Sequence, residues 1–206
     1  MTVYDLLKGL PGALWRRFGT LNVQGAGNIP ASGPFLLIAN HQSILDPLLI
    51  QSVIQRPIHT MTKSTQFQVP FLGWLMANHL NCFPVRRYEV DPQAVRMVLR
   101  RLREGEGVGI YVEGERSWDG RLQPPRRGAV RLLMAAGVPV IPAVITGSYE
   151  AWPRWARRPA RADIQIRFGR ALALPKPAAR REEREAVLAE ATRCVVAALD
   201  PGGRKG

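Results

Sequence analysis

Residues 40–46, Asn-His-Gln-Ser-Ile-Leu-Asp, hold the side chains best suited to chemistry in this chain of 206 residues. His41 titrates near neutral pH and can take a proton from an alcohol, and Asp46 can orient the imidazole. Residues five apart lie about 140° apart on a helix, so the two side chains meet only if the turn before Pro47 is non-helical. The spacing is compatible with a base oriented by a carboxylate, and also with a turn histidine beside an Asp46 that only caps a helix.

The residues around this turn predict where it lies in a fold. The apolar run Phe35–Ala39 before it is typical of a buried strand, and ligands bind beyond the carboxyl ends of strands in open α/β sheets. Asp46 and Pro47 are typical of an N-cap and a first helical position, which predicts a helix to about Ile54. We interpret Ser43 as bonded to the local backbone and not as a nucleophile, because the chain has no Gly-x-Ser-x-Gly motif.

Strands and helices alternate along the chain, which predicts a single α/β domain with a mixed, mostly parallel central sheet flanked by helices. Pro11 is expected to divide the amphipathic segment Tyr4–Phe18 into two short helical pieces. A charged helix is expected over 178–199, with an apolar stripe at positions 187, 191, 194, 195 and 198. Further helices are expected after Asp91-Pro92 and over 127–136, and strands over 21–23, 58–62, 108–112, 138–145 and 164–168, the last at a sheet edge.

Two uncharged stretches, 64–85 and 132–149, are long enough to raise the question of a membrane span. Polar residues and prolines interrupt the first, and Gly137, Pro139 and Pro142 interrupt the second. Neither can satisfy its backbone in lipid as one helix. We expect the first to form a short apolar helix and then a strand, and the second a helix, a glycine stop and a buried strand.

The chain carries 29 Lys and Arg against 16 Asp and Glu, a formal charge of +13. Such an excess favours a polyanionic partner, which can be nucleic acid, an anionic membrane or a phosphorylated substrate. Cys82 and Cys194 are far apart, so neither a disulfide framework nor a metal site is expected. The N-terminus lacks the pattern of a secretory signal, and the protein is therefore expected inside the cell.

Four segments in order resemble the glycerolipid acyltransferase family. Residues 40–46 match its first motif, NHxSxxD, at every fixed position. Residues 81–87 fit its G-x-F-P-V-x-R motif with Asn81 for Gly. Residues 112–117, Val-Glu-Gly-Glu-Arg-Ser, resemble PEGTRS with Val for Pro and Glu for Thr, and the apolar strand 138–145 carries the family's proline.

This resemblance implies transfer of a fatty acyl group to the hydroxyl of a lysophospholipid. His41 would deprotonate the hydroxyl and Asp46 would orient the imidazole, without an acyl-enzyme. The donor would be an acyl thioester, acyl-CoA or acyl-carrier protein, and no further cofactor or metal is implied. The acceptor would be 1-acylglycerol-3-phosphate, giving phosphatidate, or another lyso-lipid or glycolipid.

The resemblance also implies how the phosphate of the acceptor would be held. Arg87 and Arg116, with Lys63, would bind the phosphate, for which a planar guanidinium is well suited. Glu113 would pair with one of these arginines or bond the glycerol. Gly114 would let the backbone approach the ligand.

Membrane contact is expected at residues 1–20, an amphipathic segment before an acyltransferase domain over 21–206. The protein would then bind peripherally to the anionic cytoplasmic face of the cell membrane. Residues 66–80 form either a core helix or an acyl tunnel that dips into the bilayer interface. Trp152 and Trp155, among arginines, suit lipid headgroups or belong to a solvated loop.

A different class of function, a non-catalytic basic module that binds membranes or nucleic acid, would also explain the charge. The chain has neither an RNA-binding signature nor zinc-finger spacing, and residues 1–60 are nearly neutral. No nucleic-acid partner is therefore expected.

Overall fold

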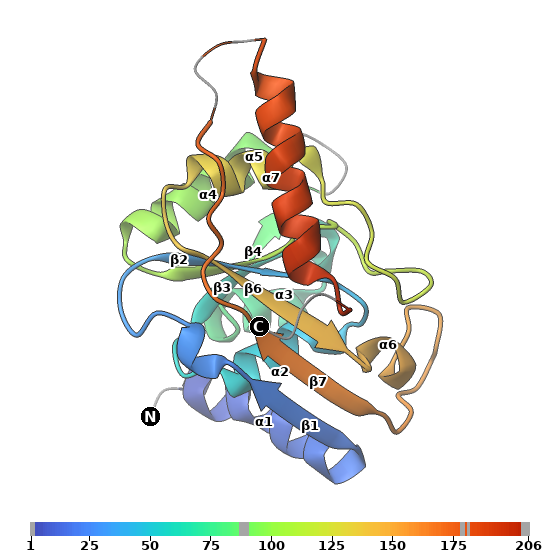
Figure 1. Cartoon of the computed structure of the whole chain (residues 1–206). Helices are drawn as coiled ribbons and strands as arrows, with labels where there is room; N and C mark the ends of the chain where they lie inside the picture. The colour runs from blue at the N-terminus through green and yellow to red at the C-terminus, as the bar shows by residue number, and fades with distance from the viewer. Residues whose placement is uncertain (1–2, 87–90, 178–179, 181, 203–206) are drawn as a thin grey trace.

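A seven-stranded sheet forms the centre of the protein, and helices cover both of its faces (Figure 1). Its strands, in the order in which they lie side by side, are β1 (Thr20–Gln24), β7 (Asp163–Phe168), β6 (Val140–Thr146), β2 (Phe35–Ala39), β5 (Gly107–Tyr111), β3 (Ile58–Lys63) and β4 (Cys82–Val85). Only β6 and β7 pair antiparallel, so the predicted mixed, mostly parallel α/β sheet is confirmed. This computed structural model describes residues 3–86, 91–177, 180 and 182–202.

Helices α1 and α2 cover one face of the sheet, and α4, α5 and α7 cover the other (Figure 1). The central strand β2 explains why both layers form, because all five of its residues are buried. Leu37 faces the α1 and α2 layer, and Leu36 and Ile38 face the opposite layer. An unbroken apolar run is what a parallel strand covered on both faces requires. The helices are α1 (Val3–Phe18), α2 (Leu45–Val53), α3 (Pro70–His79), α4 (Pro92–Arg103), α5 (Arg127–Ala135), α6 (Ser148–Ala151) and α7 (Arg184–Leu199), with 3₁₀ turns at Ala26–Asn28 and Ser64–Gln68.

The chain leaves the neighbouring strands β2 and β5 on opposite faces of the sheet. Helix α2 follows β2 and packs on one face, whereas α5 follows β5 and packs on the other. The loops at the carboxyl ends of these two strands therefore diverge, and such a point is where open α/β sheets bind ligands. His41 follows β2 and Glu113 follows β5, so both motifs meet at this point.

Two expectations about individual elements are wrong. Helix α1 runs unbroken through Pro11, because it packs along α2 with Gly12 close to Ser52. This packing offsets the hydrogen bond that proline cannot donate. Strand β7 is not at the sheet edge, because β1 pairs with it and takes the edge position. That pairing joins segments more than 140 residues apart, for example Thr20 with Asp163, and no local pattern reveals it.

The charged C-terminal helix begins at Arg184, later than the expected start at 178. Of that expected range, 178, 179 and 181 lie outside the described residues. Its buried stripe is Leu188, Ala191, Val195 and Leu199, which shares only two positions with the predicted stripe. The helix is therefore rotated relative to the expectation, because its contacts with β6 and α5 decide which residues face inward.

Neither of the two uncharged stretches forms one long helix. Residues 64–85 form a 3₁₀ turn, α3 and β4, and residues 132–149 are divided among α5, β6 and α6. Within the described ranges no helix combines the length and the apolar character that a membrane span needs.

The glycine at the start of β5 generates the first testable prediction. A Cβ on Gly107 would collide with the ring of Phe35 and lie 3.0 Å from Ile58 Cγ2, all in the core. Gly107→Ala should therefore destabilise the protein by about 1–3 kcal/mol in urea unfolding. Gly9→Ala is the matched control, since a Cβ there meets nothing within 4 Å, and it should be neutral or stabilising. Equal stabilities for the two variants would contradict the packing described for β5.

Candidate active site

His41 and Asp46 form a hydrogen-bonded pair in the turn between β2 and α2. The distance between His41 Nδ1 and Asp46 Oδ2 is 2.9 Å, and both side chains are buried. Asp46 Oδ2 also accepts from the backbone N–H groups of Gln42, at 2.7 Å, and Ser43, at 2.8 Å. A carboxylate oxygen that accepts from two amides must also accept from Nδ1, so Nδ1 carries a proton and Nε2 is the basic nitrogen of the neutral ring.

Asp46 reaches His41 because it is not the N-cap that the sequence predicted. Helix α2 begins at Leu45, two residues before the expected first position Pro47, and its N-cap residue Ile44 makes no side-chain cap bond. Asp46 turns its side chain back over the preceding turn and accepts from the amides of Gln42 and Ser43. The turn thus closes around Oδ2 of Asp46. The same oxygen accepts from His41 Nδ1 and so fixes the orientation of the imidazole.

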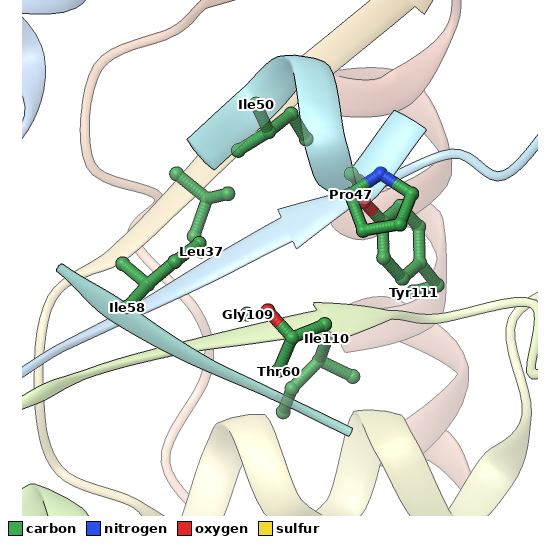
Figure 2. Close-up of a pocket in the computed structure, with 9 residues that line it drawn as sticks. Leu37, Pro47, Ile50, Ile58, Thr60, Gly109, Ile110 and Tyr111 are labelled. Carbon is green, nitrogen blue, oxygen red and sulfur yellow. The ribbon is translucent and has the colours of Figure 1, made fainter. Parts of the chain in front are cut away.

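One face of the His41 imidazole packs on the ring of Tyr111, at the end of β5. The two rings stack with their centroids 4.1 Å apart. Burial, reinforced by the charge of Asp46, raises the pKa of Tyr111 well above its ordinary value, so its phenol stays neutral. Tyr111 and Pro47 also line a small cavity between α2 and the sheet (Figure 2). The cavity holds about 10 Å³, room for about one water, and is too small for a substrate.

Glu113 binds the His41 turn through the backbone and not through an arginine. Its Oε1 accepts from the His41 N–H at 2.6 Å, and its Oε2 accepts from the Gln123 N–H at 2.8 Å. Within the described residues Glu113 therefore does not pair with Arg116, because both of its oxygens face backbone amides. Arg87 lies outside the described residues, and the alternative that Glu113 bonds the glycerol stays a prediction. Burial raises the pKa of the Glu113 carboxyl to about 7, despite the opposing effect of these two hydrogen bonds.

Three further contacts fix the same turn to neighbouring strands and loops. The Asn40 side chain donates to the carbonyl of Ile145 and accepts from its N–H, both at 2.8 Å, as a sheet partner would. The Ser117 N–H donates to the His41 carbonyl at 2.7 Å. Gln42 donates to the carbonyl of Gly120 at 2.6 Å. The backbone of β6 and of the loop after β5 together hold His41 in place.

Ser43 has one bond to the local backbone, as the sequence analysis expected, and a second to a distant loop. Its hydroxyl donates to the Trp152 carbonyl at 2.8 Å and accepts from the Leu45 N–H at 3.3 Å. It is fully buried. These bonds explain a serine at this position without a nucleophilic role.

The residues expected to hold a phosphate gather only in part. Arg116 is half-buried, and burial followed by the charge of Arg154 lowers the pKa of its guanidinium. Lys63 is exposed at the carboxyl end of β3, on the same sheet edge as His41. Gly114 has a φ of 75°, and a Cβ there would lie 3.2 Å from Arg126. Arg87 lies outside the described residues.

An apolar groove of about 430 Å³ begins at the loop after β5. It runs between the sheet and the helices α4 and α5, and Tyr111 and Gly114 are among the residues that line it. Sequence reasoning did not find this groove, because its walls come from five separate elements. Apolar residues of α4 and α5 that line it, such as Val95 and Leu132, are its local sign in the sequence. Its other apolar walls include Met61, Val85, Ala94 and Ala129.

A three-layer α/β fold with a His–Asp pair at the carboxyl edge of its sheet defines the class of the protein. Residues 20–146 match the model of the Acyltransferase family. Since the match covers more than half of the 206 residues, the chain belongs to this family.

Several relatives carry one particular activity in their names. A chloroplastic 1-acyl-sn-glycerol-3-phosphate acyltransferase of Brassica napus is 33% identical over 141 residues, which are 66% of this chain and 40% of that protein. The 1-acyl-sn-glycerol-3-phosphate acyltransferase of Bacillus subtilis is 29% identical over 130 residues, 63% of this chain and 64% of that protein. The chain thus spans less than two thirds of the length of these relatives.

A solved structure confirms the fold. The crystal structure of the 1-acyl-sn-glycerophosphate acyltransferase of Thermotoga maritima matches with a TM-score of 0.72 at 23% identity. The match covers 93% of this chain and 78% of that chain.

The raised pKa of Glu113 generates a prediction about pH. Between pH 4.5, its ordinary pKa, and about 7 the folded protein holds a proton that the unfolded chain releases. The free energy of unfolding should therefore fall as the pH rises through this window. Glu113→Gln, which cannot titrate, should remove this component from unfolding curves measured at pH 4.5 to 8.

The control is Glu190→Gln on the exposed side of α7, which should leave the slope unchanged. An identical pH dependence for wild type and Glu113→Gln would show that folding does not raise the pKa of Glu113.

Proposed function

We propose that this protein transfers a fatty acyl group from an acyl thioester to the hydroxyl of 1-acylglycerol-3-phosphate, giving phosphatidate. Membership of the Acyltransferase family and the names of the relatives support this reaction. The observation that carries the proposal is the contact between His41 Nδ1 and Asp46 Oδ2, which leaves Nε2 as a base at the ligand-binding edge of the sheet.

His41 and Asp46 are proposed to act as a general base and its orienting carboxylate. Nε2 removes the proton of the acceptor hydroxyl while the oxygen attacks the thioester carbonyl. The new C–O bond forms, the C–S bond breaks, and the imidazolium returns the proton to the leaving thiolate. Asp46 stabilises the imidazolium through Nδ1. No step requires Ser43, whose hydroxyl is bonded to backbone groups.

The apolar groove is proposed to hold an acyl chain. Its volume of about 430 Å³ falls in the range of small-molecule pockets, about 300–1,000 Å³. It begins at the Tyr111–Gly114 loop, which is bonded to His41 through Glu113. A chain in this groove would leave its thioester carbonyl near His41. Acyl-CoA and acyl-carrier protein both present such a chain, so either is a proposed donor.

The acceptor phosphate is proposed to bind Arg116, with Lys63 and Arg87. Arg116 is supported by its place beside Ser117, whose N–H is bonded to the His41 carbonyl. A guanidinium can bind a phosphate through two parallel hydrogen bonds, which also orients the glycerol hydroxyl.

Loss of the base tests the reaction. His41→Ala should lower acyl transfer from acyl-CoA or acyl-carrier protein to lysophosphatidate by about 10²-fold or more, because it removes the proton acceptor. Asp46→Asn should lower kcat by a similar factor, since the neutral amide lacks the negative charge that stabilises the imidazolium. Product formation is measured with labelled acyl donor, and circular dichroism checks that each variant is folded.

Ser43→Ala is the matched control in the same buried turn. It should lose about 1 kcal/mol of stability and keep most of the activity. Full activity of His41→Ala, or the absence of transfer to any lysolipid by the wild type, would overturn the proposed function.

Peripheral binding to the anionic cytoplasmic face of a membrane is also proposed, with residues 1–20 as the associating segment. Exposed apolar side chains surround the sheet edge that carries His41. Phe18 ends α1 just before β1, on the side of the sheet where β6 ends, and Phe71 lies in the first turn of α3 after β3. Phe71 and Trp74 are 72% and 54% exposed. Arg16 and Arg17 lie beside Phe18 and suit anionic headgroups.

The membrane proposal predicts a loss of vesicle binding on removal of these rings. The double change Phe71→Ser and Trp74→Ser should weaken cosedimentation with phosphatidylglycerol vesicles about tenfold or more, because it removes two apolar groups that enter the interface. Val196→Ser, at an exposed apolar position on α7, is the control and should bind like the wild type. Equal binding by the double variant would exclude α3 from the interface.

A further inference from the structure

The third motif of this chain has a carboxylate, Glu115, where the family pattern has threonine. Two arginines hold it. Its Oε1 lies 3.2 Å from Arg126 Nη2, and its Oε2 lies 3.5 Å from Arg154 Nη1. The side chains of Glu115 and Arg154 are only 25% and 23% exposed, so this pair is shielded from solvent more than a typical surface ion pair. The carboxylate thus lies between two guanidinium groups.

Arg154 itself is fixed in position by other contacts. Its guanidinium carbon lies 3.3 Å from the centroid of the Trp118 ring, and its Nη1 donates to the Arg116 carbonyl at 3.1 Å. The Trp118 carbonyl in turn accepts from the Tyr149 hydroxyl at 2.8 Å. A guanidinium held on an aromatic face loses little freedom when it binds a ligand, which makes Arg154 a prepared anion-binding group.

Arg154 lies at the proposed phosphate site although it comes from a distant segment. It follows α6, beyond residue 146, where the family match ends. Besides burial, which lowers the pKa of the Arg116 guanidinium most, two charged groups shift this pKa. The charge of Arg154 lowers it, and the charge of Asp46 raises it. The neighbouring Ser117 N–H is bonded to the His41 carbonyl. One continuous set of contacts therefore joins Arg154 to the His41 turn.

We infer that Arg154 binds the anionic headgroup of the acceptor, and that Glu115 is an internal counter-ion which the acceptor's phosphate displaces. The inference rests on the proposed function for the identity of the acceptor. In the free protein the Glu115 carboxylate neutralises Arg154 and Arg126. A phosphomonoester carries more negative charge and three acceptor oxygens, so it replaces the carboxylate at the guanidinium groups.

The two residues should have opposite effects on acceptor binding. Arg154→Gln should raise KM for lysophosphatidate about tenfold or more with little change in kcat, and Arg154→Lys should restore part of the loss. Glu115→Gln keeps the shape and removes the competing charge, and it should lower KM about threefold. In the Arg154→Gln background the same change should have a smaller effect, because the two groups interact.

The control variant is Arg158→Gln, which removes one positive charge from an exposed position in the same loop. It should leave KM unchanged and so separates headgroup binding from general attraction of the lipid surface. A role of Arg154 in folding alone would lower the thermal stability and leave KM unchanged, and that result would overturn the inference.

Calorimetry with glycerol 3-phosphate distinguishes failure of this inference from failure of the proposed function. If wild type transfers no acyl group but binds glycerol 3-phosphate, with weaker binding in Arg154→Gln and tighter binding in Glu115→Gln, the anion site stands and the reaction does not. If transfer occurs and Arg154→Gln has the KM of the wild type, the reaction stands and the anion site does not. Absence of both transfer and binding overturns both.

Discussion

The buried carboxylate of Asp46 is the constraint on which the rest of the site depends. A charge with no exposure to solvent is costly unless hydrogen bonds compensate it. Oδ2 accepts from His41 Nδ1 and from two backbone amides, while Oδ1 has no hydrogen-bond partner within the described part of the chain. All three hydrogen bonds that compensate the buried charge therefore go to Oδ2, and the turn over 41–43 has to close around this oxygen. The same closure that stabilises the charge also orients the imidazole.

The sheet supports this turn from both neighbouring strands. Asn40 pairs with the backbone of Ile145 on β6, and Glu113, after β5, accepts from the His41 N–H. A long apolar strand alone would leave its carboxyl end free to move. Bonds from both sides hold the His41 turn in place, which is what the proposed base needs to meet a reacting hydroxyl at hydrogen-bond distance.

The arginines that make up much of the positive charge lie in different surroundings. Arg126 and Arg154 are held at Glu115, whereas Arg100 and Arg101 pair with Glu104 on the exposed face of α4. Only the first group lies near the His41 turn. The exposed aromatic side chains gather at the same sheet edge. Apolar side chains beside a cluster of guanidinium groups are the arrangement on which the proposed binding to an anionic lipid surface rests.

The sequence by itself determined the alternation of strands and helices, the mostly parallel sheet, and the turn in which His41 and Asp46 could meet, because periodicity and motif spacing are local properties. Only the tertiary structure decided that Glu113 binds amides, that β1 covers the edge of β7, and that Arg154 reaches Glu115. Each of these joins segments tens of residues apart. Such pairings depend on how elements pack, and packing is set by the whole core and not by any one segment.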